Sequence, residues 1–371
     1  MRIPNWPQAT EREAELLKIV LASPQWGGFH PFVAEFEQRF TNYQQGRHGI
    51  STFNGTVSLE LALEVLDVGP GDEIIVPSIS FISTATAVSR VGATPVFVDI
   101  EEWSFNMDPM QTREALSPRT KGIVAVHFGG SLCRVDELQA ICLERELFLL
   151  EDAAHAQGSE WKGKRAGSFG IAGSFSFQNG KVLSSGEGGL LITSDDVFAE
   201  EARSIANQGR IGGRSFYEHH RLGTNFRLTG FQAAVLLAQL ESLPMQIEQR
   251  AASVRLLKSL LMDVPEIVWQ EELPELTQNS NYLLLGRLRD ARMTRSDFCR
   301  ALSGAGVPCT PFYPHPLYGN PLYQAGNCRI LPCPVAEACV EDAFWFPHRL
   351  LLSDEETIAE VAHCVRKILH G

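Results

Sequence analysis

Gly122-Ile-Val-Ala-Val126, Val135 to Arg145 and Leu147-Phe-Leu-Leu150 are three consecutive segments that decide the fold class of this chain. The first and the last are short apolar runs, which are typical of buried strands. The middle segment has its apolar residues at the spacing of an amphipathic helix. Two parallel strands joined by a crossover helix form a β-α-β unit. The three segments therefore predict a parallel sheet covered by helices.

The same alternation extends on both sides of this unit, from Gly55 to about Thr193. Further strand candidates are Glu73-Ile-Ile-Val76, Pro95-Val-Phe-Val98 and Gly189-Leu-Leu-Ile-Thr193, and further helix candidates are Val57 to Leu66 and Thr84 to Val91. Repeated β-α-β units predict an α/β fold with a mainly parallel sheet flanked by helices. Upstream, Glu11 to Leu21 and Phe32 to Thr41 are predicted to be two helices on the outside of the sheet.

A second, smaller domain is expected in the C-terminal third. A long amphipathic segment from Thr229 to about Leu260, predicted to break near Pro244, leads out of the first domain. It is followed by a predicted strand (Tyr282 to Leu288), a helix (Arg295 to Ala305), a proline-rich loop and a closing helix (Asp354 to Leu369). The expected domains are residues 1–245, with the N-terminal helices, and residues 246–371.

Composition narrows the class of protein. Of the 371 residues, 44% are hydrophobic and 20% charged, the balance of a globular chain with a large core. The net charge of −12 argues against nucleic acid or a membrane surface as the main partner. No stretch approaches the roughly 20 apolar residues of a membrane helix, and the N-terminus lacks the apolar region of a signal peptide, so a cytoplasmic protein is expected. The eight cysteines form no Cys-x-x-Cys pair and are expected to be reduced, mostly structural thiols.

Polar residues that directly follow the apolar runs are the first candidates for a site, because parallel sheets bind ligands at the carboxyl ends of their strands. Asp152 follows the run that ends at Leu150, and His155 comes three residues later. The same residues also suit a helix cap and a hydrogen-bonded core histidine. No third ligand lies nearby, so no metal site is expected.

Lys181 is the second candidate. The chain contains seven lysines, and the other six lie in contexts typical of exposed helix faces or polar turns. Lys181 follows Phe175 and Phe177 and precedes a glycine-rich exit, so its ammonium is expected to be partly desolvated and its pKa lowered, as a Schiff-base lysine requires. An exposed turn lysine before a hairpin is the alternative interpretation.

A phosphate cradle is predicted at Asn54-Gly55-Thr56, which leads directly into the helix expected from Val57. Taken alone, these residues are also a good capping sequence. Together, such a cradle, a strand-end Asp152, His155 and Lys181 are the parts that a pyridoxal phosphate enzyme needs in this order. There the carboxylate keeps the pyridine nitrogen protonated, and the lysine carries the cofactor as an imine and shuttles the proton.

The chain resembles the DegT/StrS group of sugar and cyclitol aminotransferases, which have the aspartate aminotransferase fold. The resemblance covers essentially the whole chain and is carried by residues 54–63 (N-G-T-V-S-L-E-L-A-L), 69–78 (G-P-G-D-E-I-I-V-P-S), 92–100 (G-A-T-P-V-F-V-D-I), 151–158 (E-D-A-A-H-A-Q-G), 174–181 (S-F-S-F-Q-N-G-K), 185–189 (S-G-E-G-G) and 225–234 (N-F-R-L-T-G-F-Q-A-A). Residues 6–8, 176–181 and 346–352 look most like the branch of 3-amino-5-hydroxybenzoate synthase and the inosose aminotransferases. The resemblance implies fold type I of the pyridoxal phosphate enzymes, with a seven-stranded type of sheet in the large domain.

The resemblance also implies a role for each candidate residue. Lys181 is similar to the lysine that carries pyridoxal 5'-phosphate, Asp152 to the partner of the pyridine nitrogen, and His155 to the residue beside the ring and its phenolic oxygen. The remaining matches are Gly55, Thr56 and Ser176 with phosphate contacts, Phe81 with the aromatic that stacks on the ring, and Asn225 with an asparagine lent across a dimer interface to the neighbour's phosphate. A homodimer with a twofold axis is therefore expected.

The implied activity is transfer of an amino group from glutamate or glutamine to a keto sugar, expected to be nucleotide-linked, or to a keto cyclitol. A dehydratase of the same family is one alternative, although such enzymes have histidine in place of Lys181, and a catalytically silent sugar-binding relative is another. A nicotinamide enzyme is disfavoured because no strand runs into Gly-x-Gly-x-x-Gly. Candidates for the acceptor pocket are Tyr313, His315 and Tyr318 in the proline-rich stretch 308–321, and His127-Phe-Gly-Gly130.

Overall fold

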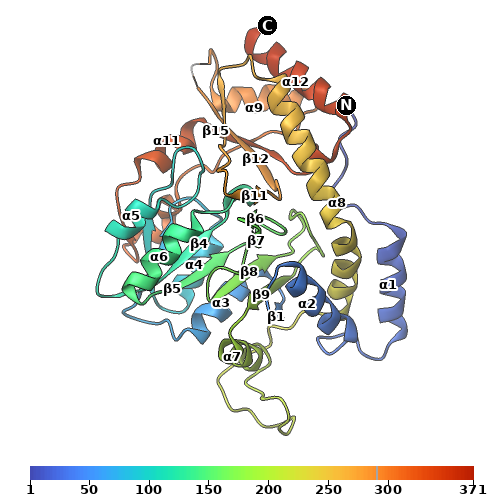
Figure 1. The fold of residues 1–371 in the computed structure, drawn as a ribbon, viewed down its shortest axis with the longest axis vertical. Coiled ribbons are helices and arrows are strands. Elements are labelled where there is room, and N and C mark those ends of the chain that lie inside the picture. The colour runs from blue at the N-terminus through green and yellow to red at the C-terminus, as the bar shows by residue number, and fades with distance from the viewer. Residues whose placement is uncertain (290) are drawn as a thin grey trace.

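The structure is a computed structural model that describes residues 1–289 and 291–371. An eight-stranded sheet in the order β1-β9-β8-β5-β4-β2-β3-β14 forms its centre (Figure 1). Neighbours from β8 to β14 are parallel, and β9 pairs antiparallel with both β8 and β1. The strands are β1 (His48–Thr52), β2 (Glu73–Pro77), β3 (Thr94–Val98), β4 (Thr120–Val126), β5 (Phe148–Asp152), β8 (Ala172–Ser176), β9 (Gly189–Thr193) and β14 (Arg329–Ile330).

The predicted α/β class with a mainly parallel sheet is confirmed. The sheet has one strand more than the seven expected, because β14, from the C-terminal part of the chain, pairs along the free edge of β3. The sequence interpretation also missed β1, whose His-Gly-Ile-Ser-Thr run is neither continuously apolar nor cleanly alternating, and β8, whose Ala-Gly-Ser-Phe-Ser run contains little apolar sequence. Antiparallel pairing with β9 holds β1 at the other edge.

Helices cover both faces of the sheet, as the alternation of side chains along its strands requires. In β4, Ile123 and Ala125 belong to one buried apolar cluster and Val124 to another. The cluster with Val124 lies under α3 (Gly55–Val65), α4 (Ser83–Arg90) and α7 (Asp196–Ala206), and the other lies under α1 (Glu11–Ala22), α2 (Pro31–Tyr43), α6 (Val135–Arg145) and the first half of α8 (Gly230–Leu260). Helix α5 (Pro109–Glu114) lies near α6 (Figure 1).

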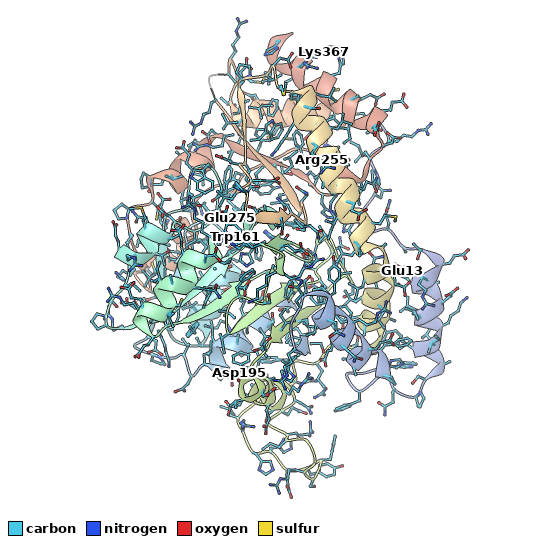
Figure 2. All side chains as sticks on the ribbon, viewed as in Figure 1. Glu13, Trp161, Asp195, Arg255, Glu275 and Lys367 are labelled. Atoms are coloured by element: carbon cyan, nitrogen blue, oxygen red, sulfur yellow. The ribbon has the colours of Figure 1, made fainter. Side chains whose placement is uncertain are left out.

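The two N-terminal helices pack against α8, on the outside of the sheet, as predicted. Thr10 and Glu13 form a capping box at the start of α1. Glu13, labelled in Figure 2, is buried and accepts a hydrogen bond from Gln239 of α8. The same residue therefore caps one helix and joins it to another.

The small domain is built on a four-stranded sheet in the order β10-β12-β15-β13, with antiparallel pairs. Its strands are β10 (Ile267–Trp269), β12 (Leu283–Leu288), β13 (Thr310–Pro311) and β15 (Ala343–Pro347), and its helices include α9 (Arg295–Gly304) and α12 (Glu355–His370). These elements and the end of α8 share one apolar core. A three-stranded sheet of β11 (Leu276–Gln278), β6 (Glu160–Trp161) and β7 (Lys164–Arg165) brings residues of both predicted domains together.

Helix α8 passes through Pro244 without the predicted break. Proline removes one backbone donor and disfavours the helical conformation of the residue before it. Here Leu240, Leu243 and Ile247, on either side of the proline, are buried in the core, and this packing supports the helix on both sides of Pro244. The expected domain boundary after residue 245 lies inside this helix and stays a prediction.

Shorter elements complete the chain: α10 (Pro321–Gln324), α11 (Pro334–Asp342), and the 3-10 turns η1 (Phe128–Gly130), η2 (Leu317–Gly319) and η3 (Leu350–Leu352). All eight cysteines are free thiols, six of them buried. Within residues 1–289 and 291–371, no helix has the length and apolar character needed to cross a bilayer.

Candidate active site

A cavity of about 500 Å³ lies at the carboxyl edge of the parallel strands. Seven of the eight predicted site residues line it: Gly55, Thr56, Phe81, Asp152, His155, Ser176 and Lys181. The sheet brings them together because β2, β5 and β8 run in the same direction, so that the segments after these strands meet at one edge. The N-terminus of α3 closes the same edge.

Asp152 is the last residue of β5 and is buried. Its Oδ2 accepts a hydrogen bond from Oγ1 of Thr84 at 2.7 Å, and its Oδ1 accepts a longer one from the amide of Ala154 at 3.3 Å. The residues after it form turns and not a helix, so the helix-cap interpretation does not apply. Burial raises the pKa of Asp152, while Thr84 and the charge of Lys181 act in the opposite direction. A cation placed against this carboxylate would hold it ionised.

His155 lies three residues further on, in the turn that follows β5, and is also buried. The amide of Gly129 donates to Nδ1 at 3.3 Å, so the neutral ring carries its proton on Nε2. Burial, followed by the charge of Lys181, lowers the pKa of His155 well below its usual value. The imidazole is therefore a neutral hydrogen-bond donor to the cavity.

Lys181 lies in the turn between β8 and β9, half-buried, with its side chain in the cavity. Its Nζ is 4.7 Å from the centroid of the Tyr282 ring. Burial lowers the pKa of Lys181 to about 8, against the opposing charge of Asp152. A lysine with this pKa is partly neutral, and hence nucleophilic, near pH 8.

The predicted phosphate cradle is made of the first turn of α3 and three hydroxyl groups. Asn54 caps the helix through the amide of Val57, and the amides of Gly55 and Thr56 precede the first intrahelical hydrogen bond. Oγ1 of Thr56 donates to Oγ of Ser83 at 2.7 Å, and Ser83 and Ser176 line the cavity beside it. Hydroxyl groups at the positive end of a helix dipole suit a phosphate.

Gly55 permits a close approach between this helix and the sheet. A Cβ at residue 55 would lie 2.7 Å from Cβ of Ser176 and 3.2 Å from the carbonyl oxygen of Phe175. Only glycine therefore allows the start of α3 to lie against the end of β8, where Ser176 is located.

Phe81 follows β2 and leaves 59% of its surface exposed at the wall of the cavity. An apolar ring of this size gains little from water contact, and its position suits stacking against a flat ligand. Asn225, by contrast, is not among the residues that line the cavity. It is exposed, in an isolated bridge with Asn207, and its Oδ1 accepts from the amide of Arg227.

Several lining residues escaped the sequence analysis, notably Thr84, Gln178, Glu187 and Tyr282. Thr84 and Tyr282 begin predicted elements and were interpreted only as helix and strand. For Glu187, the only sequence feature that pointed to the site was its position in the glycine-rich segment 185–189, shortly after Lys181. Tyr313, a candidate for the acceptor pocket, does line the cavity, whereas His315 and Tyr318 bond to Pro316 and Glu337.

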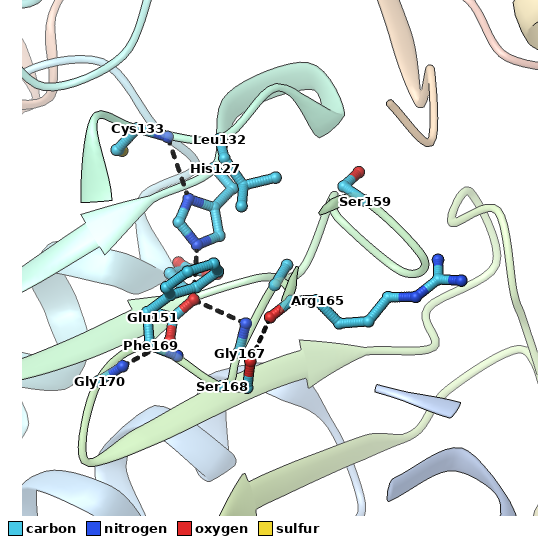
Figure 3. A network of polar contacts seen from close by, with 12 residues as sticks. His127, Leu132, Cys133, Glu151, Ser159, Arg165, Gly167, Ser168, Phe169 and Gly170 are labelled. Carbon is cyan, nitrogen blue, oxygen red and sulfur yellow. Dashed lines mark hydrogen bonds and ion pairs between the residues drawn. The ribbon is translucent and has the colours of Figure 1, made fainter. Parts of the chain in front are cut away.

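His127, also considered for the acceptor pocket, belongs to a separate buried network (Figure 3). Its Nδ1 accepts from the amide of Cys133, and its Nε2 lies 2.9 Å from Oε2 of Glu151. Glu151 also accepts from the amides of Gly167, Phe169 and Gly170. Residues alternate sides along a strand, so Glu151 points away from the cavity that its neighbour Asp152 enters, and it holds the loop after β7 to the sheet.

The donor set as a whole fits pyridoxal phosphate. The buried carboxylate of Asp152 could pair with a protonated ring nitrogen, the amine of Lys181, with its lowered pKa, could react with a carbonyl, and the N-terminus of α3 with its hydroxyls would suit the phosphate. No group of three or more His, Cys, Asp or Glu residues in the described part of the chain is placed to hold a metal ion.

Comparison with known proteins agrees with this chemistry. Residues 7–366 match the DegT/DnrJ/EryC1/StrS aminotransferase family. The chain is 34% identical to 3-amino-5-hydroxybenzoate synthase of Amycolatopsis mediterranei (strain S699), with 98% of this chain and 96% of that protein covered. It is also 34% identical to L-glutamine:2-deoxy-scyllo-inosose aminotransferase of Streptomyces kanamyceticus, over 99% and 93% of the two chains. The crystal structure of a 3-amino-5-hydroxybenzoic acid synthase superposes with a TM-score of 0.93 at 34% identity and covers 99% of this chain and 98% of that one.

Proposed function

This chain belongs to the DegT/DnrJ/EryC1/StrS aminotransferase family, and from that premise we propose that it transfers an amino group from glutamine or glutamate to a neutral, polyhydroxylated ketone such as a keto cyclitol. Lys181 and pyridoxal phosphate are at the centre of the proposed site. The observation that carries the proposal is that Lys181, Asp152 and the N-terminus of α3 line one cavity. Each supports a different part of the same cofactor.

Pyridoxal phosphate supplies a reactive carbonyl and a conjugated ring that accepts the electron pair released beside the nitrogen. Asp152 would pair with the ring nitrogen of the bound cofactor, and its negative charge would favour the protonated form of that nitrogen. Thr84 holds the carboxylate in place through its 2.7 Å hydrogen bond. Lys181 would supply the amine that carries the cofactor, and its Nζ, with a pKa of about 8, is suited to move a proton.

The other residues bind and orient. Because the Nδ1 of neutral His155 is engaged by Gly129, its Nε2–H would be free to donate to an oxygen of the cofactor ring. Gly55, Thr56 and Ser176 would hold the phosphate, and Phe81 would pack on the ring, since all four line the cavity. Tyr282 lies under Lys181 and keeps water away from the ammonium.

The charge of the cavity supports a neutral acceptor. Among the described lining residues, Lys181 is the cation, and Asp152 and Glu187 are the carboxylates, which leaves one net negative charge before the cofactor binds. A nucleotide diphosphate would meet no arginine within this lining. The two curated relatives described above take their names from an aminobenzoate and from an inosose, and the second also names glutamine as the donor. A nucleotide-linked keto sugar is the competing acceptor in the test below.

The functional unit is proposed to be a homodimer in which Asn225 reaches the phosphate of the neighbouring site. Asn225 lies outside the cavity of its own chain and is exposed. The surrounding loop between α7 and α8 extends beyond the body of the molecule (Figure 1) and exposes Tyr217 by 85% and Leu222 by 91%. Exposed apolar side chains on an extended loop support a partner surface there. The cytoplasmic location stays a prediction.

The test is an amino-transfer assay with purified protein and pyridoxal phosphate. L-Glutamine and L-glutamate are each paired with an inosose and with a nucleotide-linked keto sugar, and the amino product is measured by mass spectrometry. We expect product from the inosose, and none from Lys181→Ala, while Lys367→Ala on α12 serves as the matched lysine control. Product from the nucleotide sugar alone would overturn the acceptor assignment, and turnover by Lys181→Ala would overturn the whole proposal.

A further inference from the structure

The turn that carries Lys181 is held from outside the large sheet. Within the turn, the amide of Lys181 donates to the carbonyl of Gln178 at 2.9 Å. Two consecutive carbonyls, those of Gly180 and Lys181, are engaged by distant residues. His348 Nε2 lies 3.0 Å from the oxygen of Gly180, and Trp6 Nε1 donates to the oxygen of Lys181 at 3.0 Å.

His348 is a neutral donor in this contact. It is buried, and burial together with the charge of Arg250 lowers the pKa of His348 to about 3. A carbonyl oxygen only accepts, so Nε2 carries the proton of the neutral ring. The amide of His348 also donates to the carbonyl of Tyr282 at 3.0 Å, so the residue binds both the turn and the tyrosine under Lys181.

Trp6 lies in an N-terminal strap, residues 2–8, that connects the two domains. At one end, the amide of Arg2 donates to Thr357 of α12 at 3.2 Å, and Arg349 donates to the carbonyl of Pro4 at 3.3 Å. At the other end, Gln239 of α8 donates to the carbonyl of Gln8 at 2.8 Å. Figure 1 shows this course, from the side of α12 down along α8. The indole between these anchors is therefore held against the turn.

The rings form a continuous row behind Lys181. Trp6 meets His348 edge-on with centroids 4.6 Å apart, and His348 stacks on Tyr282 at 5.7 Å. Tyr282 in turn lies 4.3 Å from His155. Nζ of Lys181 lies over the Tyr282 ring.

We propose that Trp6 and His348 are positioning residues for Lys181, which hold the two carbonyls of its turn so that Nζ stays over the Tyr282 ring, in the cavity that Asp152 also lines. The inference rests on the proposed function of Lys181. The segment 177–188 has no regular structure and contains three glycines, so its few backbone hydrogen bonds leave it more conformational freedom than a strand or helix has. A small displacement of a reacting group costs a large part of the rate.

The first experiment compares Trp6→Phe with Trp269→Phe, both reconstituted with pyridoxal phosphate. Phenylalanine keeps an aromatic edge against His348 but removes the N–H donor. Trp269 packs on Phe344 and Phe346 in the small-domain core and is the matched control. Measurements are made at a temperature where circular dichroism shows both variants folded. We expect Trp6→Phe to lose about tenfold in kcat with KM for donor and acceptor within about twofold, the pattern of a displaced reacting group.

A second readout does not depend on turnover. The apo-protein is mixed with pyridoxal phosphate at a series of pH values, trapped with borohydride, and the label on Lys181 is measured by mass spectrometry. We expect the pH midpoint of labelling to rise in Trp6→Phe relative to Trp269→Phe, because a loosened turn lets the ammonium reach water.

His348→Gln and His348→Phe separate the donor from the ring. Glutamine retains an N–H donor, so it should retain at least fivefold more kcat than phenylalanine, which retains only the ring. Two results would each overturn the proposal: Trp6→Phe indistinguishable from Trp269→Phe in both readouts, or His348→Gln no better than His348→Phe. A separate variant tests the proposed function itself. If Lys181→Ala still turns over substrate, or is labelled as much as the unchanged protein, the proposed role of Lys181 is wrong.

Discussion

Nζ of Lys181 lies 4.7 Å from the centre of the Tyr282 ring, and the rings of His155 and His348 also lie beside that ring. This contact buries the one lysine of the cavity on an aromatic face. Burial disfavours the charged form, and the pKa of Lys181 is lowered to about 8. The neutral amine, which is the nucleophile, is therefore available about two pH units earlier than in an ordinary lysine near 10.4.

The first prediction concerns this pH dependence. The rate at which pyridoxal phosphate attaches to the apo-protein should rise with pH through about 8 and level off above it, since Lys181 is protonated below that value and neutral above it. In Asp152→Asn the midpoint should move to lower pH, because the charge of Asp152 favours the ammonium. Stopped-flow absorbance across pH 6 to 11 measures both. A midpoint near 10 would mean that Lys181 is solvated like a surface lysine.

The second prediction concerns the pair of Thr84 and Asp152. Asp152→Asn should lower kcat by roughly 10- to 150-fold with the cofactor still bound, since hydrogen bonds to charged groups contribute about 1.5–3 kcal/mol. Thr84→Val removes the hydrogen bond that orients Asp152, together with the contact to Ser80, and should cost roughly two- to tenfold. Thr86→Val, on the same helix, is the control. The kcat of each variant is measured by steady-state kinetics. Equal kcat values for Thr84→Val and Thr86→Val would show that Thr84 does not orient Asp152 for catalysis.

Gly55→Ala should weaken cofactor binding. The added Cβ would lie 2.7 Å from that of Ser176, so the start of α3 must move away from β8 and the phosphate contacts separate. We expect the Kd for pyridoxal phosphate to rise about tenfold or more, from the loss of at least one charge-assisted hydrogen bond. Gly69→Ala is the matched control, because the nearest atom to its new Cβ is 3.9 Å away. The Kd of each variant is measured by titrating the apo-protein with pyridoxal phosphate and following the absorbance. Equal Kd values for the two variants would contradict the proposed phosphate site at the start of α3.

The dimer is tested through Asn225. If Asn225 donates to the neighbour's phosphate, Asn225→Ala should raise the cofactor Kd roughly 10- to 150-fold, the effect of about 1.5–3 kcal/mol. Mixing this variant with Lys181→Ala at limiting cofactor should produce heterodimers with one site that carries both defects and one that carries neither. Activity above either parent is expected. Were Asn225 to act within its own chain, each site would keep one defect and mixing would restore nothing.

Glu151 should matter for stability more than for chemistry. Glu151→Ala removes the acceptor of three loop amides and of His127, all in the buried network of Figure 3. Leaving a buried donor without its acceptor costs about 1–3 kcal/mol, and several donors lose Glu151 at once. Glu144→Ala, which removes an exposed partner of Arg113, should change little. Urea unfolding of the two variants measures the difference, and equal midpoints would show that the loop does not depend on Glu151.

The sequence by itself determined the alternation of strands and helices from residue 55 to 193, and with it the sheet edge at which polar residues meet. Strand and helix periods are local properties, so Asp152 could be placed after a strand and Gly55 at a helix start from a few neighbouring residues. Gly55, Thr56, Asp152, His155 and Lys181 were identified from such local patterns, whereas Phe81 and Ser176 were identified only through the family resemblance. All seven line the cavity.

Only the tertiary structure decided which other residues reach that cavity and which do not. Trp6 meets Lys181 across 175 residues and His348 meets Gly180 across 168, and these contacts exist because the N-terminal strap and the end of β15 pack against the turn. Likewise, His127 and Asp152 both follow apolar strand residues, but pairing with Glu151 takes His127 out of reach. No local period specifies such pairings, because they depend on how segments far apart in the chain fill the same core.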